Sequence, residues 1–347
     1  MPTMGTSDGG TRETAPAGRS VPREIAADGP CVSVRVPAKA NLFLAVRGVR
    51  DDGYHELVTV MQTVSIFDRL RVAVVGPPGQ GHHPASRRHM GVELWHDAIE
   101  GLPSGEDNLA VRAALALGAA AGVLDVTATR EDIGRSGVRT VIDLDKGIPM
   151  AGGMAGGSAD AAAALTALNR LWGCEFSRDD LRAVGASLGS DVPFCVVGGT
   201  ALATGRGSAL AQVLCRGVFH WVVCRAEEPL STPDVYAAWD AHCKPSEIEP
   251  DAVLHALRTE DAVALGAALH NDLEPAAFTL RPELEDQKKL LLDAGALGAV
   301  LSGSGPTLLA LTEDEAAARE LAEQVQGEFA SVNVARSPAG GPELVAC

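Results

Sequence analysis

A glycine-rich segment in the middle of the 347-residue chain is its strongest chemical signal. It reads Ile148-Pro-Met-Ala-Gly-Gly-Met-Ala-Gly-Gly-Ser-Ala-Asp160 and leads into an alanine-rich stretch of helical composition, residues 161–171. Glycines let the backbone approach a ligand closely, and the free N–H groups at a helix N-terminus attract phosphate. The segment therefore predicts a phosphate-binding loop, with Ser158 as an N-cap or a metal-bound hydroxyl. The alternative is a plain turn in which Ser158 only caps the helix.

This loop does not match the two common nucleotide-binding motifs. The chain contains no Gly-Lys dipeptide, which a Walker A loop requires. The spacing of Gly152, Gly153, Gly156 and Gly157 also does not fit G-x-G-x-x-G. A nucleotide that binds here is therefore held in another way.

Three further segments combine polar side chains with features that could shape a cleft. Lys39 and Asn41 follow an expected strand at alternate positions, so they point to one face. Asp191 precedes Val-Pro at an expected helix-to-strand junction. The segment 301–307, Leu-Ser-Gly-Ser-Gly-Pro-Thr, predicts a glycine turn between two strands. Taken singly, these segments also fit an exposed strand end, a capping aspartate and a simple hairpin.

Other motifs favour competing functions. Gly185-Ala-Ser187-Leu-Gly189 matches the nucleophile elbow of serine hydrolases, but it lies at the end of an expected helix instead of a strand-to-helix turn. Three histidines, His82, His83 and His89, could bind a metal, although their Pro- and Gly-containing loop favours solvated side chains. Tyr54, just after a turn, could pack locally or stack on a base.

The elements that must position these residues alternate between strands and helices. Alternation of apolar residues predicts strands over 31–36, 42–46, 57–67, 70–75, 138–144, 218–224 and 331–335, with a strand–turn–strand unit over 298–311. Helical patterns cover 109–117, 161–171, 177–189, most of 233–295, and 316–325. This order predicts an α/β or α+β fold. We expect a disordered tail over 1–30, an N-terminal domain over 31–210, a C-terminal domain over 211–337 and a loose tail over 338–347.

Composition excludes several classes of protein. Lys and Arg total 29 and Asp and Glu total 45, so the formal net charge is −16, which argues against nucleic-acid binding. The seven cysteines are odd in number and widely spaced, which predicts neither a disulfide framework nor a zinc ribbon. No stretch is long and apolar enough for a signal peptide or a membrane span. We therefore expect a cytoplasmic protein without a membrane partner.

Taken together and in this order, the motifs resemble those of the GHMP kinases. The resemblance spans about residues 31–336 and depends on ordered segments that are specific only in combination. These segments are Pro37-Ala-Lys-Ala-Asn-Leu-Phe-Leu44, Asp52-Gly-Tyr-His-Glu-Leu57, Glu106-Asp-Asn-Leu109, Asp145-Lys-Gly-Ile-Pro-Met150, Leu188-Gly-Ser-Asp-Val-Pro193 and Asn271-Asp-Leu-Glu274. The resemblance implies a two-domain α/β fold with an N-terminal ATP-binding domain and the active site in the cleft between the domains.

The resemblance also implies roles for individual residues. Asp191 corresponds to the catalytic aspartate that accepts the proton of the substrate hydroxyl, and Lys39 to the partner that keeps it ionised. The expected ATP-binding residues are Asn108, Lys146, Pro149, Ala151, Gly152, Gly153, Met154, Ala155, Gly156, Gly157 and Ser158, with Mg²⁺ on Ser158. The expected acceptor-binding residues are Asn41, Tyr54, His55 and Tyr236, the two tyrosines lying on either side of a cytosine ring.

Within the family, the motifs fit the branch whose acceptor is a methylerythritol linked to cytidine diphosphate, phosphorylated on its 2-hydroxyl for non-mevalonate isoprenoid synthesis. An acceptor of the homoserine or mevalonate type, or a non-catalytic binding protein of the same fold, are the alternatives. The resemblance leaves monomer and homodimer open. The chain departs from the family at Ala151 and Ala155, where Gly is frequent, and at Asp160, where Asn is frequent.

Overall fold

The structure is a computed structural model that describes residues 30–76, 90–96, 99, 101–125 and 136–347. The expected tail over 1–30 and the histidine-containing loop over 76–91 fall almost entirely outside these ranges. His82, His83 and His89 are among the residues outside. The proposed metal-binding role of these histidines therefore stays a prediction.

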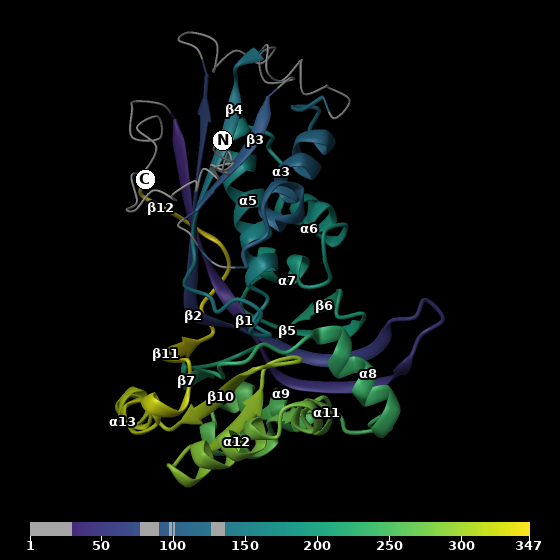
Figure 1. Cartoon of the computed structure of the whole chain (residues 1–347), viewed down its shortest axis with the longest axis vertical. Helices are drawn as coiled ribbons and strands as arrows, with labels where there is room; N and C mark the ends of the chain where they lie inside the picture. The colour runs from purple at the N-terminus through teal and green to yellow at the C-terminus, as the bar shows by residue number, and fades with distance from the viewer. Residues whose placement is uncertain (1–29, 77–89, 97–98, 100, 126–135) are drawn as a thin grey trace, which may run out of the picture.

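Two β-sheets organise the described part of the chain (Figure 1). The first sheet contains β1 (Cys31–Val49), β2 (His55–Val75), β3 (Gly91–His96), β4 (Arg139–Asp145), β5 (Thr200–Gly205), β6 (Ala209–Gln212), β8 (His270–Asn271) and β12 (Glu343–Val345). The second has the order β11-β7-β10-β9, formed by β7 (Phe219–Arg225), β9 (Gly298–Leu301), β10 (Thr307–Thr312) and β11 (Ser331–Ser337). This mixture of sheets and helices agrees with the predicted fold class.

The helices divide between the two sheets. Beside the first sheet, in the upper half of Figure 1, lie α3 (Leu109–Ala120), α5 (Gly156–Trp172), α6 (Arg178–Ala186) and α7 (Val192–Val197). The later helices are α8 (Thr232–His242), α9 (Asp251–Thr259), α10 (Ala262–Ala268), α11 (Glu274–Leu280), α12 (Glu283–Asp293) and α13 (Glu315–Val325). Two short 3₁₀ turns complete the described elements, η1 (Gly105–Asp107) and η2 (Gln326–Glu328). No helix in the described ranges is long and apolar enough to cross a membrane.

The first two strands are longer than predicted. Each pair of strands expected within 31–75 forms one continuous strand, β1 or β2, and the two pair antiparallel along most of their length. Pro37 is tolerated inside β1 because the register shifts between Pro37 and Ala38, a bulge where no ladder donor is needed. In Figure 1 these two strands of the first sheet extend beyond the second sheet and project beside α8. They therefore connect the two halves of the molecule.

Alanine makes the packing around α5 close. Ala161, Ala162, Ala163 and Ala164 are fully buried in the same core as Val36 of β1. Helix α5 packs on β1, β2, α3 and α7. Small side chains let backbones approach one another, so the N-terminus of α5 is held close to β1 and its side chains.

The C-terminal segment differs from the expected loose tail over 338–347. Its strand β12 pairs antiparallel with β1, with Ser33 opposite Val345. The same register brings Cys31 opposite Cys347, where the structure has a disulfide with a Cα–Cα distance of 6.5 Å. This bond departs from the prediction that the chain has no disulfide framework. Sequence spacing missed it because the two cysteines meet only after β12 has paired with β1.

The chain passes from the first sheet to the second between Gln212 and Phe219. This position is close to the boundary expected at 210 and 211. However, β8 and β12 return to the first sheet, and residues of α9 and α10 share the core of the first sheet. The exact division into 31–210 and 211–337 stays a prediction.

Candidate active site

A cavity of about 950 Å³ brings together most of the predicted site residues. Its wall is formed by parts of β1, the loop before α5, the start of α7, the start of α8 and the loop between β9 and β10. The predicted residues on the wall are Lys39, Asn41, Tyr54, His55, Asn108, Lys146, Pro149, Ala151, Gly152, Gly153, Met154, Ala155, Gly156, Gly157, Asp191 and Tyr236. Ser158 is not among the lining residues.

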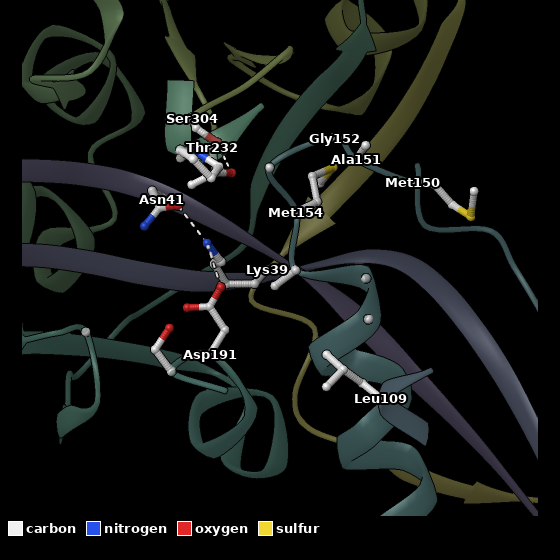
Figure 2. A pocket seen from close by; sticks show the side chains of 18 of the residues that line it. Lys39, Asn41, Leu109, Met150, Ala151, Gly152, Met154, Asp191, Thr232 and Ser304 are labelled. Carbon is white, nitrogen blue, oxygen red and sulfur yellow. Dashed lines mark hydrogen bonds and ion pairs between the residues drawn. The ribbon is translucent and has the colours of Figure 1, made fainter. Parts of the chain in front are cut away.

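Lys39 and Asp191 meet across this cavity, as Figure 2 shows. The Lys39 Nζ lies 3.5 Å from Asp191 Oδ2 and donates a 2.8 Å hydrogen bond to Asn41 Oδ1. Asn41 in turn donates to Thr59 Oγ1 at 2.8 Å. The Lys39 side chain is 7% exposed and that of Asp191 is 31% exposed. The lysine is therefore held in place by Asn41, while the carboxylate is open to a bound alcohol.

The backbone around Asp191 differs from the predicted helix-to-strand junction. Asp191 is the N-cap of α7, and Pro193 lies in the first turn of that helix. Proline fits there because the first helical N–H groups have no partner within the helix. Ser187, the candidate hydrolase nucleophile, is the C-cap of α6 and donates its hydroxyl to Val184 O. It does not lie on a strand-to-helix turn, so the elbow hypothesis lacks its required context.

The two glycine-rich loops pack against each other. Gly153 has a φ of 72°, and a Cβ there would lie 2.1 Å from Ser302 O of the loop between β9 and β10. The Ser302 hydroxyl donates to Gly153 O at 3.0 Å. Only glycine fits at this crossing, so the first loop needs it for packing as well as for access to a ligand.

Helix α5 begins one turn earlier than predicted. Its N-cap is Ala155, with a φ of 56°, and Ser158 is the third residue of the helix. The N-cap role predicted for Ser158 is therefore wrong, because the helix starts at Gly156. Ala155 has no side-chain acceptor, so the first N–H groups of α5 remain directed at the cavity. The magnesium role of Ser158 stays a prediction.

Aromatic side chains form a separate part of the cavity wall, here called the aromatic end, which contains Tyr54, His55 and Tyr236. The rings of His55 and Tyr236 lie 4.5 Å apart, and His55 Nε2 is 2.8 Å from Asp240 Oδ1. Burial, with a smaller contribution from the Asp191 charge, raises the pKa of Tyr236 to about 12. Tyr54 is 52% exposed and lies under the guanidinium of Arg206. The two tyrosines line one cavity, but the Tyr54 ring already contacts Arg206 and the Tyr236 ring already contacts His55.

A buried charged cluster lies behind the first loop. Asp68 of β2 accepts hydrogen bonds from Gly147 N, Ile148 N and Lys146 Nζ, and it is fully buried. Lys146 also lies 2.8 Å from Asp160 Oδ2 in α5. Burial and the charge of Asp68 raise the pKa of Asp160 well above its usual range. The cluster therefore places two buried carboxylates on one lysine, and the neutral form of Asp160 is favoured.

Comparison with known proteins identifies this arrangement. Residues 108–199 match the model for the GHMP kinases N terminal domain, and residues 253–331 match that for GHMP kinases C terminal. The 4-diphosphocytidyl-2-C-methyl-D-erythritol kinase of Saccharopolyspora erythraea is 43% identical over 90% of this chain and 94% of its own length. The chain belongs to the 4-diphosphocytidyl-2-C-methyl-D-erythritol kinase family of GHMP kinases.

Other relatives agree. The kinase of the same name from Mycolicibacterium smegmatis is 42% identical over 90% of this chain and 92% of its own. A crystal structure of a 4-(cytidine 5'-diphospho)-2C-methyl-D-erythritol kinase has a TM-score of 0.68 at 31% identity, and covers 91% of this chain and 100% of that one. A homoserine kinase from Cytophaga hutchinsonii shares the fold, with a TM-score of 0.66 at 20% identity over 91% and 97% of the two chains. The predicted family is confirmed, and with it an ATP-using kinase.

The structure of this kinase adds residues that the sequence motifs missed. Thr59 orients Asn41, and a hydrogen bond of 2.7 Å joins Thr232 to Ser304 on the cavity wall (Figure 2). Arg206 reaches the cavity from the turn between β5 and β6. In the sequence, Asp68 is a charge between two apolar stretches and Arg206 is a cation between two glycines, but neither pattern indicates which residue is the partner.

Some predicted ATP contacts in this kinase are already engaged within the protein. Asn108 caps α3 by accepting from Ala110 N at 2.9 Å, and its amide donates to Pro103 O. Lys146 is committed to Asp68 and Asp160. Their roles near the adenosine stay predictions, and contact with ATP would use atoms that these bonds leave available.

Replacing Ala155 with glycine is expected to stabilise this kinase. Ala155 has a positive φ, a backbone conformation that costs an L-residue with a Cβ about 1–2 kcal/mol. We expect Ala155→Gly to raise the free energy of unfolding by about 0.5–1 kcal/mol in urea titrations without ATP. The control is Ala237→Gly on the exposed side of α8, which should lower it by a similar amount. A loss of stability in Ala155→Gly would contradict this account.

Asp160→Asn is expected to change how stability depends on pH. Because its pKa is raised, folded Asp160 holds a proton that the unfolded chain loses near pH 4, so the wild type loses stability as pH rises above about 4. Asparagine removes this loss, and the stability of the variant relative to wild type should grow by up to about 1.4 kcal/mol per pH unit. Urea unfolding at several pH values measures it.

Asp180 gives a control of opposite sign. Hydrogen bonds from the hydroxyl and backbone of Ser177 lower its pKa, so its contribution to stability is present above about pH 4 and lost below. Asp180→Asn should therefore lose stability relative to wild type as pH rises. If the stability of Asp160→Asn and of Asp180→Asn relative to wild type changed in the same direction with pH, the raised pKa of Asp160 would be contradicted.

Proposed function

We propose that this kinase transfers the γ-phosphoryl group of ATP to the 2-hydroxyl of 4-diphosphocytidyl-2-C-methyl-D-erythritol, in non-mevalonate isoprenoid precursor synthesis. The observation that carries the proposal is that one cavity joins the Lys39–Asp191 pair, the glycine-rich loop and the His55–Tyr236 pair. The relatives named for this acceptor support it. Because ATP is the phosphoryl donor, we propose a cytoplasmic location.

In this proposal, Asp191 acts as the general base. Its partly exposed carboxylate accepts the proton of the 2-hydroxyl as the oxygen attacks phosphorus. Lys39 places its positive charge 3.5 Å from this carboxylate and is itself oriented by Asn41. Asn41 thereby contributes to acceptor binding through its neighbour as well as by its place on the wall.

The glycine-rich loop and the start of α5 are proposed to bind the phosphates of ATP. The N–H groups of Gly156 and Gly157 lie in the first turn of α5, where neither the backbone nor a capping side chain supplies an acceptor. Such donors need no rearrangement as charge develops on the transferred group. The positive end of the helix dipole adds to this attraction.

We propose that Mg²⁺ enters the site with ATP. Asp107 and Asp191 offer carboxylates on the cavity wall, and the described residues contain no closed group of three or more potential ligands. Such an open set fits Mg²⁺, which keeps several waters and uses one or two carboxylates together with phosphates. When bound, the ion would neutralise charge on the transferred phosphoryl group.

The aromatic end of the cavity is proposed to bind the cytosine. Tyr54, His55 and Tyr236 offer flat surfaces, and stacking on an aromatic ring contributes about 1–3 kcal/mol per base. His55 is held by Asp240, which fixes its ring for a polar contact to the base edge. A base between Tyr54 and Tyr236 must displace the Arg206 guanidinium from the Tyr54 ring and requires the His55 ring to shift from Tyr236.

The test is ADP release with ATP and Mg²⁺ against a panel of acceptors. The panel contains the cytidylated methylerythritol, methylerythritol phosphate without cytidine, mevalonate and homoserine. Turnover confined to the cytidylated compound supports the proposal. Turnover of another acceptor overturns the acceptor assignment and keeps the kinase, whereas ATP binding without any turnover favours a non-catalytic binding protein.

A further inference from the structure

Arg206 is held at the cavity by an unusual turn. It lies between Gly205 and Gly207, whose φ values of 70° and 85° favour glycine. The backbone N–H of Gly205 donates to Glu56 Oε1 at 3.1 Å, which ties this turn to the start of β2. The segments that carry Arg206 and Tyr54 are therefore joined by this hydrogen bond.

The Arg206 guanidinium is oriented by an aromatic ring. Its Cζ lies 3.5 Å from the centroid of the Tyr54 ring, a close cation–π contact. The other two Lys and Arg side chains of the cavity wall have carboxylate partners, Lys39 with Asp191 and Lys146 with Asp68 and Asp160. Within the described residues, Arg206 has the ring in place of an ion pair. Stacking leaves its N–H donors directed outward around the ring edge.

The surroundings of Arg206 do not neutralise it fully. The charge of Arg206 contributes to lowering the pKa of Asp52. However, the Asp52 carboxylate accepts its hydrogen bonds from Arg50 and from Tyr54 N. Arg206 is also exposed, so its side chain is accessible to a ligand. The chain as a whole carries a formal charge of −16, so a polyanionic acceptor needs a local cation to enter this cavity.

We propose that Arg206 binds the diphosphate of a cytidine diphosphate acceptor and sets the preference for this group. The inference rests on the proposed function. With the base at Tyr54 and the reacting hydroxyl at Asp191, the diphosphate lies between the two. A base that stacks on Tyr54 displaces the Arg206 guanidinium from the ring and frees its donors for the phosphates beside it. A guanidinium pairs with two phosphate oxygens at once, which an ammonium does not.

Binding of cytidine diphosphate and of cytidine to Arg206→Gln, measured by calorimetry, tests this inference. We expect the variant to bind cytidine diphosphate roughly 10- to 100-fold more weakly and cytidine within about twofold of wild type. The affinity of Arg206→Lys for cytidine diphosphate should lie between those of wild type and Arg206→Gln, because lysine keeps the charge but does not bind two phosphate oxygens at once. Arg319→Gln on exposed α13 is the matched control and should bind both ligands as wild type does.

Turnover gives a second measurement. Arg206→Gln should raise the KM for the cytidylated acceptor by roughly the same 10- to 100-fold and leave kcat within about threefold. Added salt should weaken binding of cytidine diphosphate to wild type more than to the variant. A parallel loss of both ligands would overturn the inference, since Arg206 would then only support the Tyr54 ring. Unchanged binding of both would overturn it as well.

These outcomes are distinguishable from a failure of the proposed function. If wild type does not phosphorylate the cytidylated acceptor but Arg206→Gln still binds cytidine diphosphate more weakly with cytidine binding unchanged, the proposed function is overturned. The anion site at Arg206 is then supported. If wild type turns the acceptor over and the variant binds cytidine diphosphate normally, only the Arg206 inference falls. Binding of neither ligand by wild type would overturn both.

Discussion

Replacing Asp191 by asparagine is expected to lower kcat by about 10²- to 10⁴-fold, the usual contribution of a general base. The carboxamide keeps the shape of the side chain but does not accept the proton of the acceptor hydroxyl. The Lys39 contact, at 3.5 Å, would lose its ionic character while the hydrogen bond to Asn41 remains. We therefore expect the KM for ATP to change little, because the glycine-rich loop contacts this pair through the Lys39 backbone, whose N–H donates to Met154 O at 3.1 Å, and not through the Asp191 carboxylate.

Steady-state kinetics with the cytidylated acceptor, together with ATP binding by calorimetry, measure this effect. Asp179→Asn is a suitable control, because its carboxylate lies on exposed α6 and pairs with Arg182. That variant should keep the wild-type kcat. If Asp191→Asn retained more than about a tenth of kcat, the proton would have another acceptor and Asp191 would only orient the hydroxyl.

Local patterns were sufficient for much of this site. Lys39 and Asn41 share a face because alternate residues of a strand do so, and the structure joins them by a hydrogen bond. The glycine-rich loop lies before a helix as its composition predicted. The Ser177–Asp180 capping box likewise begins α6 where the sequence placed a helix start. These features depend on neighbours within a few residues, which is why a single sequence reveals them.

Features that depend on distant pairing were not predictable in this way. Asp68 meets Lys146 only because β2 pairs with β4, and Arg206 meets Tyr54 only because β5 pairs with β2. The Cys31–Cys347 bond depends similarly on the pairing of β12 with β1. Periodicity gives the face of a strand but not its neighbour. The start of α5 was missed for another reason, since Ala155 adopts a positive φ that its residue type disfavours.

Asp68→Ala is expected to be the most destabilising substitution in this site, with a loss of about 3–5 kcal/mol in the free energy of unfolding. Asp68 is fully buried and is the acceptor for Gly147 N and Ile148 N as well as Lys146. Its removal leaves the part-buried N–H of Gly147 and the buried N–H of Ile148 without this acceptor, and a buried donor without a partner costs about 1–3 kcal/mol.

The comparison with Asp160→Asn separates this cost from a general effect of altering the buried cluster. Asp160 accepts from Lys146 and has a raised pKa, so its carboxamide substitute keeps the size and the acceptor of the favoured neutral form and should retain stability at neutral pH. Urea unfolding of both variants at about pH 7 measures the difference. Because Gly147 and Ile148 lead directly into the glycine-rich loop, Asp68→Ala should also raise the KM for ATP, whereas equal stability of the two variants would show that Asp68 does not anchor the loop.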